Sequence, residues 1–405
     1  MTGTDGAANP HLVTPGGKPR ARSLGLRFGG RPGPWNAITD VPGVEVGYLT
    51  RIEGSDIRTG VTAIHPRSAA RPGDPVAAGL HAQNGNGEMT GAAWIGESGT
   101  FSGPVAITNT HAAGVAHAGI IAWTVRHHRE LADAWLMPVA AETWDGYLND
   151  INGHHVDETH VVQALERARS GPIEEGSVGG GTGMNCYGFK GGSGTASRIL
   201  DYAGRTCTVG VFLQANFGSR GELVLGGVPL GADLAADDPM SEHFSVPHGS
   251  GPHGSGPHGA GPHGAGSCIA IVATDAPLFP HQLTAFARRV TTGLARTGTA
   301  GSHFSGDLFL AFSVANPGAF APPLATLYTG PEHLDHLDFL PWGHLDPFYE
   351  AVVQATEEAV ANALVANEEM TGRDGHRTPA LPRDRVAELA GRARARREAW
   401  GAETR

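Results

Sequence analysis

A hydroxyl residue stands where a low-complexity segment changes into an apolar run. Residues 247–266 form four near-identical Pro-His-Gly pentads, and Ser267 then opens a β-branched run that ends at Thr274. The repeat offers little to a core and predicts a loop, whereas the run predicts a buried strand. If the chain cuts itself at Gly266–Ser267, the hydroxyl becomes a nucleophile, and the freed α-amine, with an ordinary pKa of about 7.7 to 8.0, becomes its base. The alternative is that Ser267 only begins a strand after a linker.

Three more polar residues stand at the ends of predicted strands. Ser305 and Asp307 precede an apolar run over 308–314. Two residues apart on an extended chain, they project to one side and can both reach one group, such as an α-ammonium. Asn216 ends another run, 206–216, where its amide can donate to an oxyanion. An ordinary turn and an ordinary cap are the structural alternatives.

Acids, amides and aromatic residues crowd together between residues 142 and 150. Glu142, Trp144 and Tyr147 belong to this stretch, which suits the wall of a polar pocket as well as a capped surface loop. The glycine-rich run 176–194 is neither a phosphate-binding loop nor a dinucleotide fingerprint. It predicts a backbone packed closely against a neighbouring segment or a substrate.

The other patterns predict a layered α/β domain that positions these residues. Runs typical of strands alternate along the chain with segments of helical periodicity. The predicted strands are 36–41, 44–48, 104–109, 206–216, 267–274 and 308–314. The predicted helices are 114–129, 158–169, 276–297, 347–367 and 383–400.

Composition narrows the class of protein. The 29 basic and 40 acidic residues give a formal charge of −11, which argues against a nucleic-acid binder. No apolar run approaches the ~20 residues that span a bilayer, and the N-terminus lacks the apolar region of a signal peptide, so we expect a cytoplasmic protein without membrane contact. The three cysteines have no CxxC spacing, which argues against disulfides and a structural zinc site.

Common catalytic and metal motifs are absent from the sequence. There is no G-x-S-x-G and no H-E-x-x-H motif, so the usual hydrolase and zinc-peptidase interpretations have no support. The segment 333–338 and the histidines of the repeat carry metal-ligand residue types, but a solvated loop and a flexible spacer explain them more simply. We expect no metal and no cofactor.

Taken together, these motifs resemble the L-aminopeptidase D-amidase/D-esterase family, which includes the β-peptidyl aminopeptidases. The resemblance implies a four-layer αββα sandwich, similar to N-terminal nucleophile hydrolases but with different connectivity. It also implies a precursor that cleaves itself before a serine. It runs in one order from about residue 20 to 316 and rests on the stretches 36–41, 85–91, 142–152, 176–194, 214–216, 267–278 and 305–307.

Carried over by position, the resemblance divides the chain and assigns its reactive residues. The polar, Pro- and Gly-rich composition of residues 1–22 predicts a disordered leader, and one catalytic domain, 23–405, follows it. Cleavage between Gly266 and Ser267 would give an α chain, 1–266, and a β chain, 267–405. Ser267 would be the nucleophile and its freed amine the general base.

The same resemblance assigns the supporting residues. Ser305 and Asp307 would orient the amine, and Asn216 would donate in the oxyanion hole. The family has a tyrosine near its Glu-Thr-x-Asp-Gly motif, where this chain has Trp144, with Tyr147 three residues later. Trp144 and Tyr147, together with Glu142, are therefore assigned to substrate binding or the oxyanion hole as a group.

We expect a metal-free, self-cleaving serine aminopeptidase that releases N-terminal residues from short peptides, amides or esters through an acyl-Ser267 intermediate. The resemblance also implies a homo-oligomer of processed αβ units, such as a tetramer. One alternative is an acyltransferase resembling ornithine acetyltransferase. The other is a non-enzymatic protein that binds metal through its histidine repeat. The sequence leaves open the preference among D-, L- and β-amino acid residues.

Overall fold

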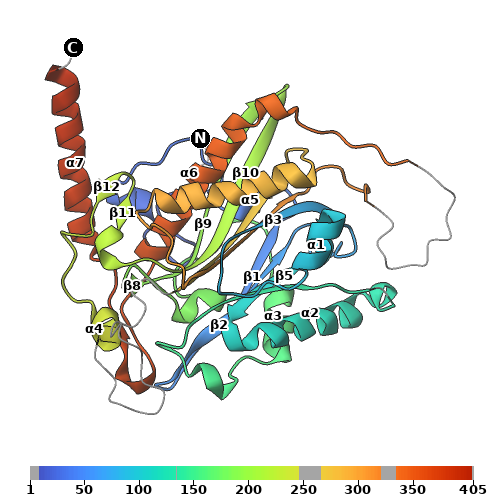
Figure 1. The fold of residues 1–405 in the computed structure, drawn as a ribbon, viewed down its shortest axis with the longest axis horizontal. Helices are drawn as coiled ribbons and strands as arrows, with labels where there is room; N and C mark the ends of the chain where they lie inside the picture. The colour runs from blue at the N-terminus through green and yellow to red at the C-terminus, as the bar shows by residue number, and fades with distance from the viewer. Residues whose placement is uncertain (1–8, 134, 246–265, 321–333, 404–405) are drawn as a thin grey trace, which may run out of the picture.

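The computed structural model describes residues 9–133, 135–245, 266–320 and 334–403 of the chain. Two β-sheets lie face to face, and helices cover the outer side of each sheet (Figure 1). This arrangement confirms the predicted αββα sandwich.

The smaller sheet has four strands in the order β1-β2-β5-β6. β5 and β6 are parallel, and the other neighbours are antiparallel. Two helices, α2 and α3, pack on its outer face. The strands are β1 (Glu45–Glu53), β2 (Ile57–His65), β5 (Val105–Asn109) and β6 (Val139–Thr143), and the helices are α2 (Ala113–His127) and α3 (Glu158–Glu166).

The larger sheet has six strands in the order β4-β3-β14-β13-β10-β9. β13 and β14 are parallel, and all other pairs are antiparallel. Helices α5 and α6 lie across its outer face (Figure 1). The strands are β4 (Thr100–Phe101), β3 (Val76–Gly85), β14 (Gly306–Ser313), β13 (Ser267–Thr274), β10 (Arg205–Asn216) and β9 (Gly192–Tyr202), and the helices are α5 (Pro280–Ala295) and α6 (Asp346–Val365).

Three further helices and three small hairpins complete the described fold. Helix α7 projects from one end of the molecule toward the C-terminus (Figure 1). The remaining helices are α1 (Ala92–Ser98), α4 (Pro239–Ser245) and α7 (Arg383–Glu403). Three small hairpins pair β7 (Asn185–Cys186) with β8 (Phe189–Lys190), β11 (Val224–Leu225) with β12 (Val228–Pro229), and β15 (Met370–Thr371) with β16 (Arg377–Thr378).

Strand β13 is buried on both faces, as its uninterrupted apolar run predicts. Alternate side chains of a strand point to opposite faces. Ile269 and Ile271 therefore join the core between the two sheets, while Ala270 and Val272 join the core under α5 and α6. The first residue of this strand, Ser267, is thereby held firmly in place and is buried.

One predicted strand is wrong. Residues 38–40 form a 3-10 turn, and only β1 of the expected hairpin is a strand. Asn36 has a left-handed backbone (φ 49°), and its side-chain amide donates to Glu358 at 2.7 Å while its oxygen accepts from the Ser197 N–H at 3.0 Å. These tertiary hydrogen bonds override the alternating pattern.

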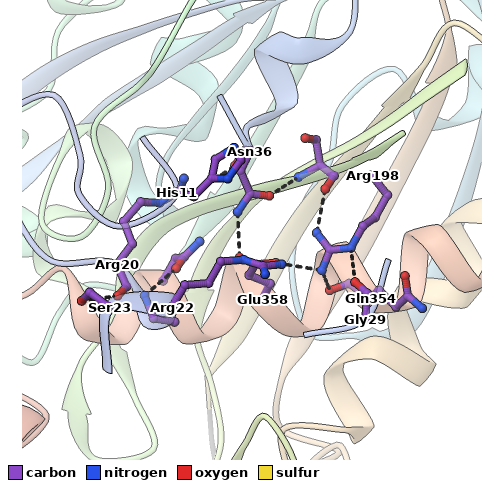
Figure 2. A network of polar contacts seen from close by, with 12 residues as sticks. His11, Arg20, Arg22, Ser23, Gly29, Asn36, Arg198, Gln354 and Glu358 are labelled. Carbon is purple, nitrogen blue, oxygen red and sulfur yellow. Dashed lines mark hydrogen bonds and ion pairs between the residues drawn. The ribbon is translucent and has the colours of Figure 1, made fainter. Parts of the chain in front are cut away.

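The expected disordered leader is wrong for residues 9–22. Arg20 is 3% exposed and forms an ion pair with Glu175 at 2.7 Å. Arg22 binds Glu358 at 2.6 Å (Figure 2). Because a buried carboxylate without a cationic partner is costly, these two glutamates fix the segment to the body of the domain.

Glu358 is the centre of this buried network (Figure 2). Its carboxylate also accepts from Arg198 at 2.8 Å. Burial alone raises the pKa of Glu358, but hydrogen bonding to Arg22 and the charge of Arg198 hold that pKa below its ordinary value. The network joins the N-terminal segment, β9 and α6.

Candidate active site

Three strand ends meet at Ser267. The serine is the first residue of β13, which lies between β10 and β14. It pairs with Asn216, the last residue of β10, and with Gly306, the first residue of β14. The sheet therefore brings together residues that the sequence places 51 and 39 positions apart, and Ser267 is 2% exposed.

Two N–H groups converge on the Ser267 hydroxyl. The backbone N–H of Trp144 donates to Oγ at 3.2 Å, and the Asn216 side-chain amide donates at 3.4 Å. Asn216 also donates to the Trp144 carbonyl at 2.9 Å, which holds the two donors side by side. A carbonyl attacked by Oγ would place its oxygen next to the hydroxyl, within reach of both donors, as an oxyanion hole requires.

The two aromatic candidates have different positions. Trp144 offers its backbone to the serine, while its indole is 40% exposed. Tyr147 is buried, its ring stacks on His376 at 4.6 Å, and its hydroxyl donates to the Arg377 carbonyl at 3.3 Å. The structure thus directs the Tyr147 hydroxyl to the β15–β16 hairpin. The donor that sequence reasoning missed is a backbone N–H, for which no residue type gives a signal.

Ser305 and Asp307 flank Gly306 and contact each other. The Ser305 hydroxyl donates to Asp307 Oδ1 at 2.7 Å, and Asn84 donates to Oδ2 at 2.9 Å. Burial raises the pKa of Asp307, while both hydrogen bonds lower it in part. Because Gly306 pairs with Ser267, this carboxyl lies next to the place where a freed Ser267 amine would be. Asn84, near the end of β3, is a partner that the sequence analysis did not identify.

Glu142 is a buried carboxylate beside the start of the neighbouring strand β14. Its Oε1 accepts from the Glu88 N–H at 2.9 Å, and Oε2 accepts from the Thr110 hydroxyl. A Cβ on Gly87 would lie 3.2 Å from both Glu142 Oε1 and Gly306 Cα, so Glu142 is adjacent to the start of β14. Burial raises its pKa. An ammonium group close to this carboxyl would gain a charge partner.

Gly266, the residue before the serine, fits only as glycine. Its carbonyl accepts from the Gly306 N–H at 3.1 Å, which continues the ladder between β13 and β14 by one residue. A Cβ at Gly266 would lie 2.0 Å from the Asn216 carbonyl oxygen. The Gly266–Ser267 peptide bond is therefore held tightly between the neighbouring strands.

Comparison with known proteins identifies the family to which this chain belongs. A sequence model described as peptidase family S58 matches residues 36–378. The chain belongs to peptidase family S58. It is 44% identical over 377 residues to the β-peptidyl aminopeptidase BapA of Sphingosinicella microcystinivorans, with 90% of each chain covered. It is 41% identical over 380 residues to BapA of Sphingosinicella xenopeptidilytica, covering 92% of this chain and 90% of that one.

Solved structures agree with this assignment to S58. The L-aminopeptidase D-Ala-esterase/amidase of Ochrobactrum anthropi, described as a prototype of the serine aminopeptidases and a variant of the Ntn hydrolase fold, has a TM-score of 0.83. It is 43% identical, and 93% of this chain and 99% of that one are covered. A Burkholderia sp. β-aminopeptidase has a TM-score of 0.79 at 42% identity, covering 91% and 98%. The predicted family and the predicted class, a serine aminopeptidase, are confirmed, and neither alternative class is favoured.

A cavity of about 520 Å³ opens at Gly266 and Asn216 in this S58 chain. Its walls combine aromatic and apolar side chains with amides, hydroxyls and two charged residues, Arg220 and Asp238. Helix α4 supplies part of one wall. Lining residues include Asn86, Trp144, Phe217, Met240, Phe244 and Phe304.

In the part of the S58 chain that the structure describes, no group of three or more His, Cys, Asp or Glu side chains could hold a metal ion. The repeat histidines lie outside the described residues, and so does His333 of the segment 333–338. Of the described helices, none is long and apolar enough to cross a membrane. All three cysteines are buried and free.

If the chain cuts itself before Ser267, replacing Gly266 with alanine should slow that cleavage by about 5- to 150-fold. The added methyl group would force a strand shift that costs about 1–3 kcal/mol, and 1.36 kcal/mol corresponds to a factor of ten in rate. The measurement is the fraction of cut chain against time after synthesis, by mass spectrometry. Gly391→Ala is the matched control, since a Cβ there meets nothing within 4 Å. Cleavage of Gly266→Ala at the control's rate would contradict the steric argument.

Proposed function

We propose that this S58 chain cuts its own Gly266–Ser267 bond and then releases N-terminal residues from short peptides, amides or esters through an acyl-Ser267 intermediate. The observation that carries the proposal is the buried Ser267 hydroxyl, which receives the N–H of Trp144 and the amide of Asn216 at the start of a central strand. The Ser267 hydroxyl is thus adjacent to the Gly266–Ser267 bond and to two hydrogen-bond donors, the Trp144 N–H and the Asn216 amide.

The self-cleavage step is an acyl shift from nitrogen to oxygen. Ser267 Oγ attacks the Gly266 carbonyl carbon, the C–N bond breaks, and the hydroxyl proton ends on the leaving nitrogen. The Gly306 N–H, which already binds the Gly266 carbonyl at 3.1 Å, would stabilise the charge on that oxygen. Water then hydrolyses the ester, which leaves a Gly266 carboxylate and a free Ser267 amine.

Turnover uses the same hydroxyl with the new amine as base. The amine takes the Oγ proton as Oγ attacks the substrate carbonyl, and then gives the proton to the leaving amine. Water releases the acyl group by the reverse proton path. The Asp307 carboxyl, held by Ser305 and Asn84, would orient the amine, and Trp144 with Asn216 would hold the oxyanion.

The Glu142 carboxylate could pair with the ammonium group of a substrate. A free amine at the substrate N-terminus would approach this carboxyl while its carbonyl approaches Ser267, which restricts cleavage to the first residue. Two curated relatives are named β-peptidyl aminopeptidases. We therefore propose amides of β-alanine as the first substrates to assay, beside those of D- and L-alanine.

We further propose a cytoplasmic homo-oligomer of cut αβ units. The family resemblance favours an assembly such as a tetramer, and three free, buried cysteines suit a reducing compartment. Light scattering of the purified protein measures the mass of the assembly directly.

Intact mass spectrometry with N-terminal sequencing tests the proposal. We expect two chains, the smaller beginning Ser267-Cys268-Ile269, and hydrolysis of at least one amino-acid amide. A single uncut chain of 405 residues that is inert toward alanine, glycine and β-alanine amides would overturn it.

A further inference from the structure

Two fully buried charged residues lie behind the oxyanion donors, and the proposed reaction gives neither of them a role. Asp145 and Lys190 are each 0% exposed. Asp145 directly follows Trp144 in the chain. Lys190 ends β8, whose partner β7 begins at Asn185. The two residues thus belong to two separate segments, and each segment touches one donor.

Lys190 ties together the turn that orients Asn216. Its Nζ donates to the Met184 carbonyl at 2.6 Å and to the Gly191 carbonyl at 2.9 Å. The next residue after Met184, Asn185, gives its backbone N–H to Asn216 Oδ1 at 2.9 Å. With Oδ1 held there, the Asn216 Nδ2 group is turned toward Ser267. The ammonium group therefore lies one residue behind the contact that sets the direction of this amide.

Hydrogen bonds to Asp145 fix the segment that carries the Trp144 N–H. Its Oδ1 accepts from Asn149 Nδ2 at 3.1 Å, and the Thr59 hydroxyl also donates to its carboxyl. Its backbone carbonyl accepts from the N–H of Asn149 at 3.0 Å, which closes a tight turn directly after Trp144. Among the described residues, Asp145 Oδ2 has no hydrogen-bond partner. A buried carboxyl oxygen of this kind needs a nearby positive charge.

The charges of the two groups are matched. Burial raises the pKa of Asp145 to about 7, and hydrogen bonds and the charge of Lys190 lower it in part. Burial lowers the pKa of Lys190 to about 7, and the Asp145 charge opposes this shift. Cys186 and Lys18 are the other titratable groups that act on Lys190. Each side chain has its own hydrogen bonds, and among the described residues the charge of each acts on the other without a direct ion pair between them.

We propose that Asp145 and Lys190 are positioning residues that act as one unit, holding the Trp144 N–H and the Asn216 amide at the spacing an oxyanion needs. The inference rests on the proposed function, since it concerns the same donors. Neither side chain touches substrate. Each acts through the backbone segment to which it is attached, and the Asn216–Trp144 hydrogen bond at 2.9 Å is where the two segments meet.

Loss of either residue should lower kcat and leave KM nearly unchanged. Oxyanion donors stabilise the transition state much more than the bound substrate, so misplacing them affects the chemical step. Removing one such donor typically costs about 10²- to 10³-fold in rate. We expect a loosened pair of donors to cost about 10- to 100-fold in kcat, with KM within about threefold of wild type.

The experiment compares Lys190→Met, Asp145→Asn and the double variant with wild type on β-alanine p-nitroanilide. Rates are divided by the amount of cut chain, measured by intact mass spectrometry, so that slow self-cleavage is not mistaken for slow turnover. Because the two residues act as a unit, the double variant should lose no more kcat than the worse single variant. Glu358→Gln is the matched control, since it disturbs the buried ion network of Figure 2 and should lower the melting temperature without lowering kcat. Arg198, which binds Glu358, pairs with Val209, seven residues along β10 from Asn216, the partner of Ser267.

The outcomes separate this inference from the proposed function. An inert wild type would overturn both. An active wild type whose Lys190→Met and Asp145→Asn variants melt earlier but keep their kcat, as the Glu358→Gln control does, would overturn this inference alone. If Lys190→Met does not fold, Asp145→Asn decides, because it keeps the shape of the carboxyl. Losses that multiply in the double variant would contradict the claim that the pair acts as one unit.

Discussion

Replacing Ser267 with alanine should leave a single uncut chain and abolish amide turnover at the same time. One hydroxyl carries both reactions in the proposed mechanism, so they must fail together. Loss of a nucleophilic serine costs on the order of 10⁶-fold in kcat in the best-studied case. The measurements are the intact mass of the purified variant and its rate on β-alanine p-nitroanilide. Circular dichroism checks that the variant is folded.

The repeat offers a matched control for this variant. Ser255 also follows a glycine, Gly254, but no strand-like run follows it. Ser255→Ala should therefore be cut before Ser267 and turn over substrate at the wild-type rate. Retained turnover in Ser267→Ala, or a cut that moves with Ser255, would contradict Ser267 as the nucleophile.

Replacing Asn216 with alanine should lower kcat by about 10²- to 10³-fold, the usual cost of one lost oxyanion donor. The Asn216 amide donates to Ser267 Oγ at 3.4 Å and to the Trp144 carbonyl at 2.9 Å. Its loss removes one donor and releases the other. Steady-state kinetics on the cut enzyme should show the fall in kcat with a smaller change in KM.

Tyr147→Phe is the comparison that separates the two candidate donors. The Tyr147 hydroxyl donates to the Arg377 carbonyl at 3.3 Å and not to Ser267, so its removal should leave kcat within about threefold of wild type. It should cost only the ~0.5–1.5 kcal/mol of stability that a typical hydrogen bond contributes. A fall as large as that of Asn216→Ala would mean that the tyrosine hydroxyl reaches the reacting carbonyl. It would also contradict the assignment of the second donor to the Trp144 backbone.

The candidate nucleophile was predictable because composition changes abruptly at one bond. A repeat without large apolar residues ends at Gly266, and β13 begins at the next residue. Asn216 and Asp307 were predictable for a related reason, since each lies at the end of an apolar run that the structure confirms as a strand. The ends of long, strongly patterned segments can be located in the sequence, so polar residues at those ends stand out as candidates.

The donors that complete the site were not predictable from residue types. The Trp144 N–H reaches a serine that is 123 positions away, and every residue except proline carries such a group. Asn84 is the second-last residue of β3, and its contact with Asp307 depends on the pairing of β3 with β14. Both contacts follow from long-range sheet order, which local patterns do not contain.

The prediction of a disordered leader failed because local composition does not show long-range ion pairs. Polar, proline- and glycine-rich composition predicts disorder because such a segment buries little apolar surface. In the structure, Arg20 forms an ion pair with the buried carboxylate of Glu175, and Arg22 forms one with Glu358. Charge pairing across more than 150 positions replaces the missing apolar contacts.

In the six-stranded sheet, strands from the two sides of Gly266–Ser267 are interleaved. β13 and β14 follow the bond in sequence, and they are hydrogen-bonded on their outer sides to β10 and β3, which precede it. A cut at this bond removes no strand, so the two products stay together until the sheet itself opens. Once they separate, reassembly is a bimolecular encounter whose yield depends on protein concentration. The lifetime of the cut protein is then set by its rate of unfolding rather than by a reversible folding equilibrium.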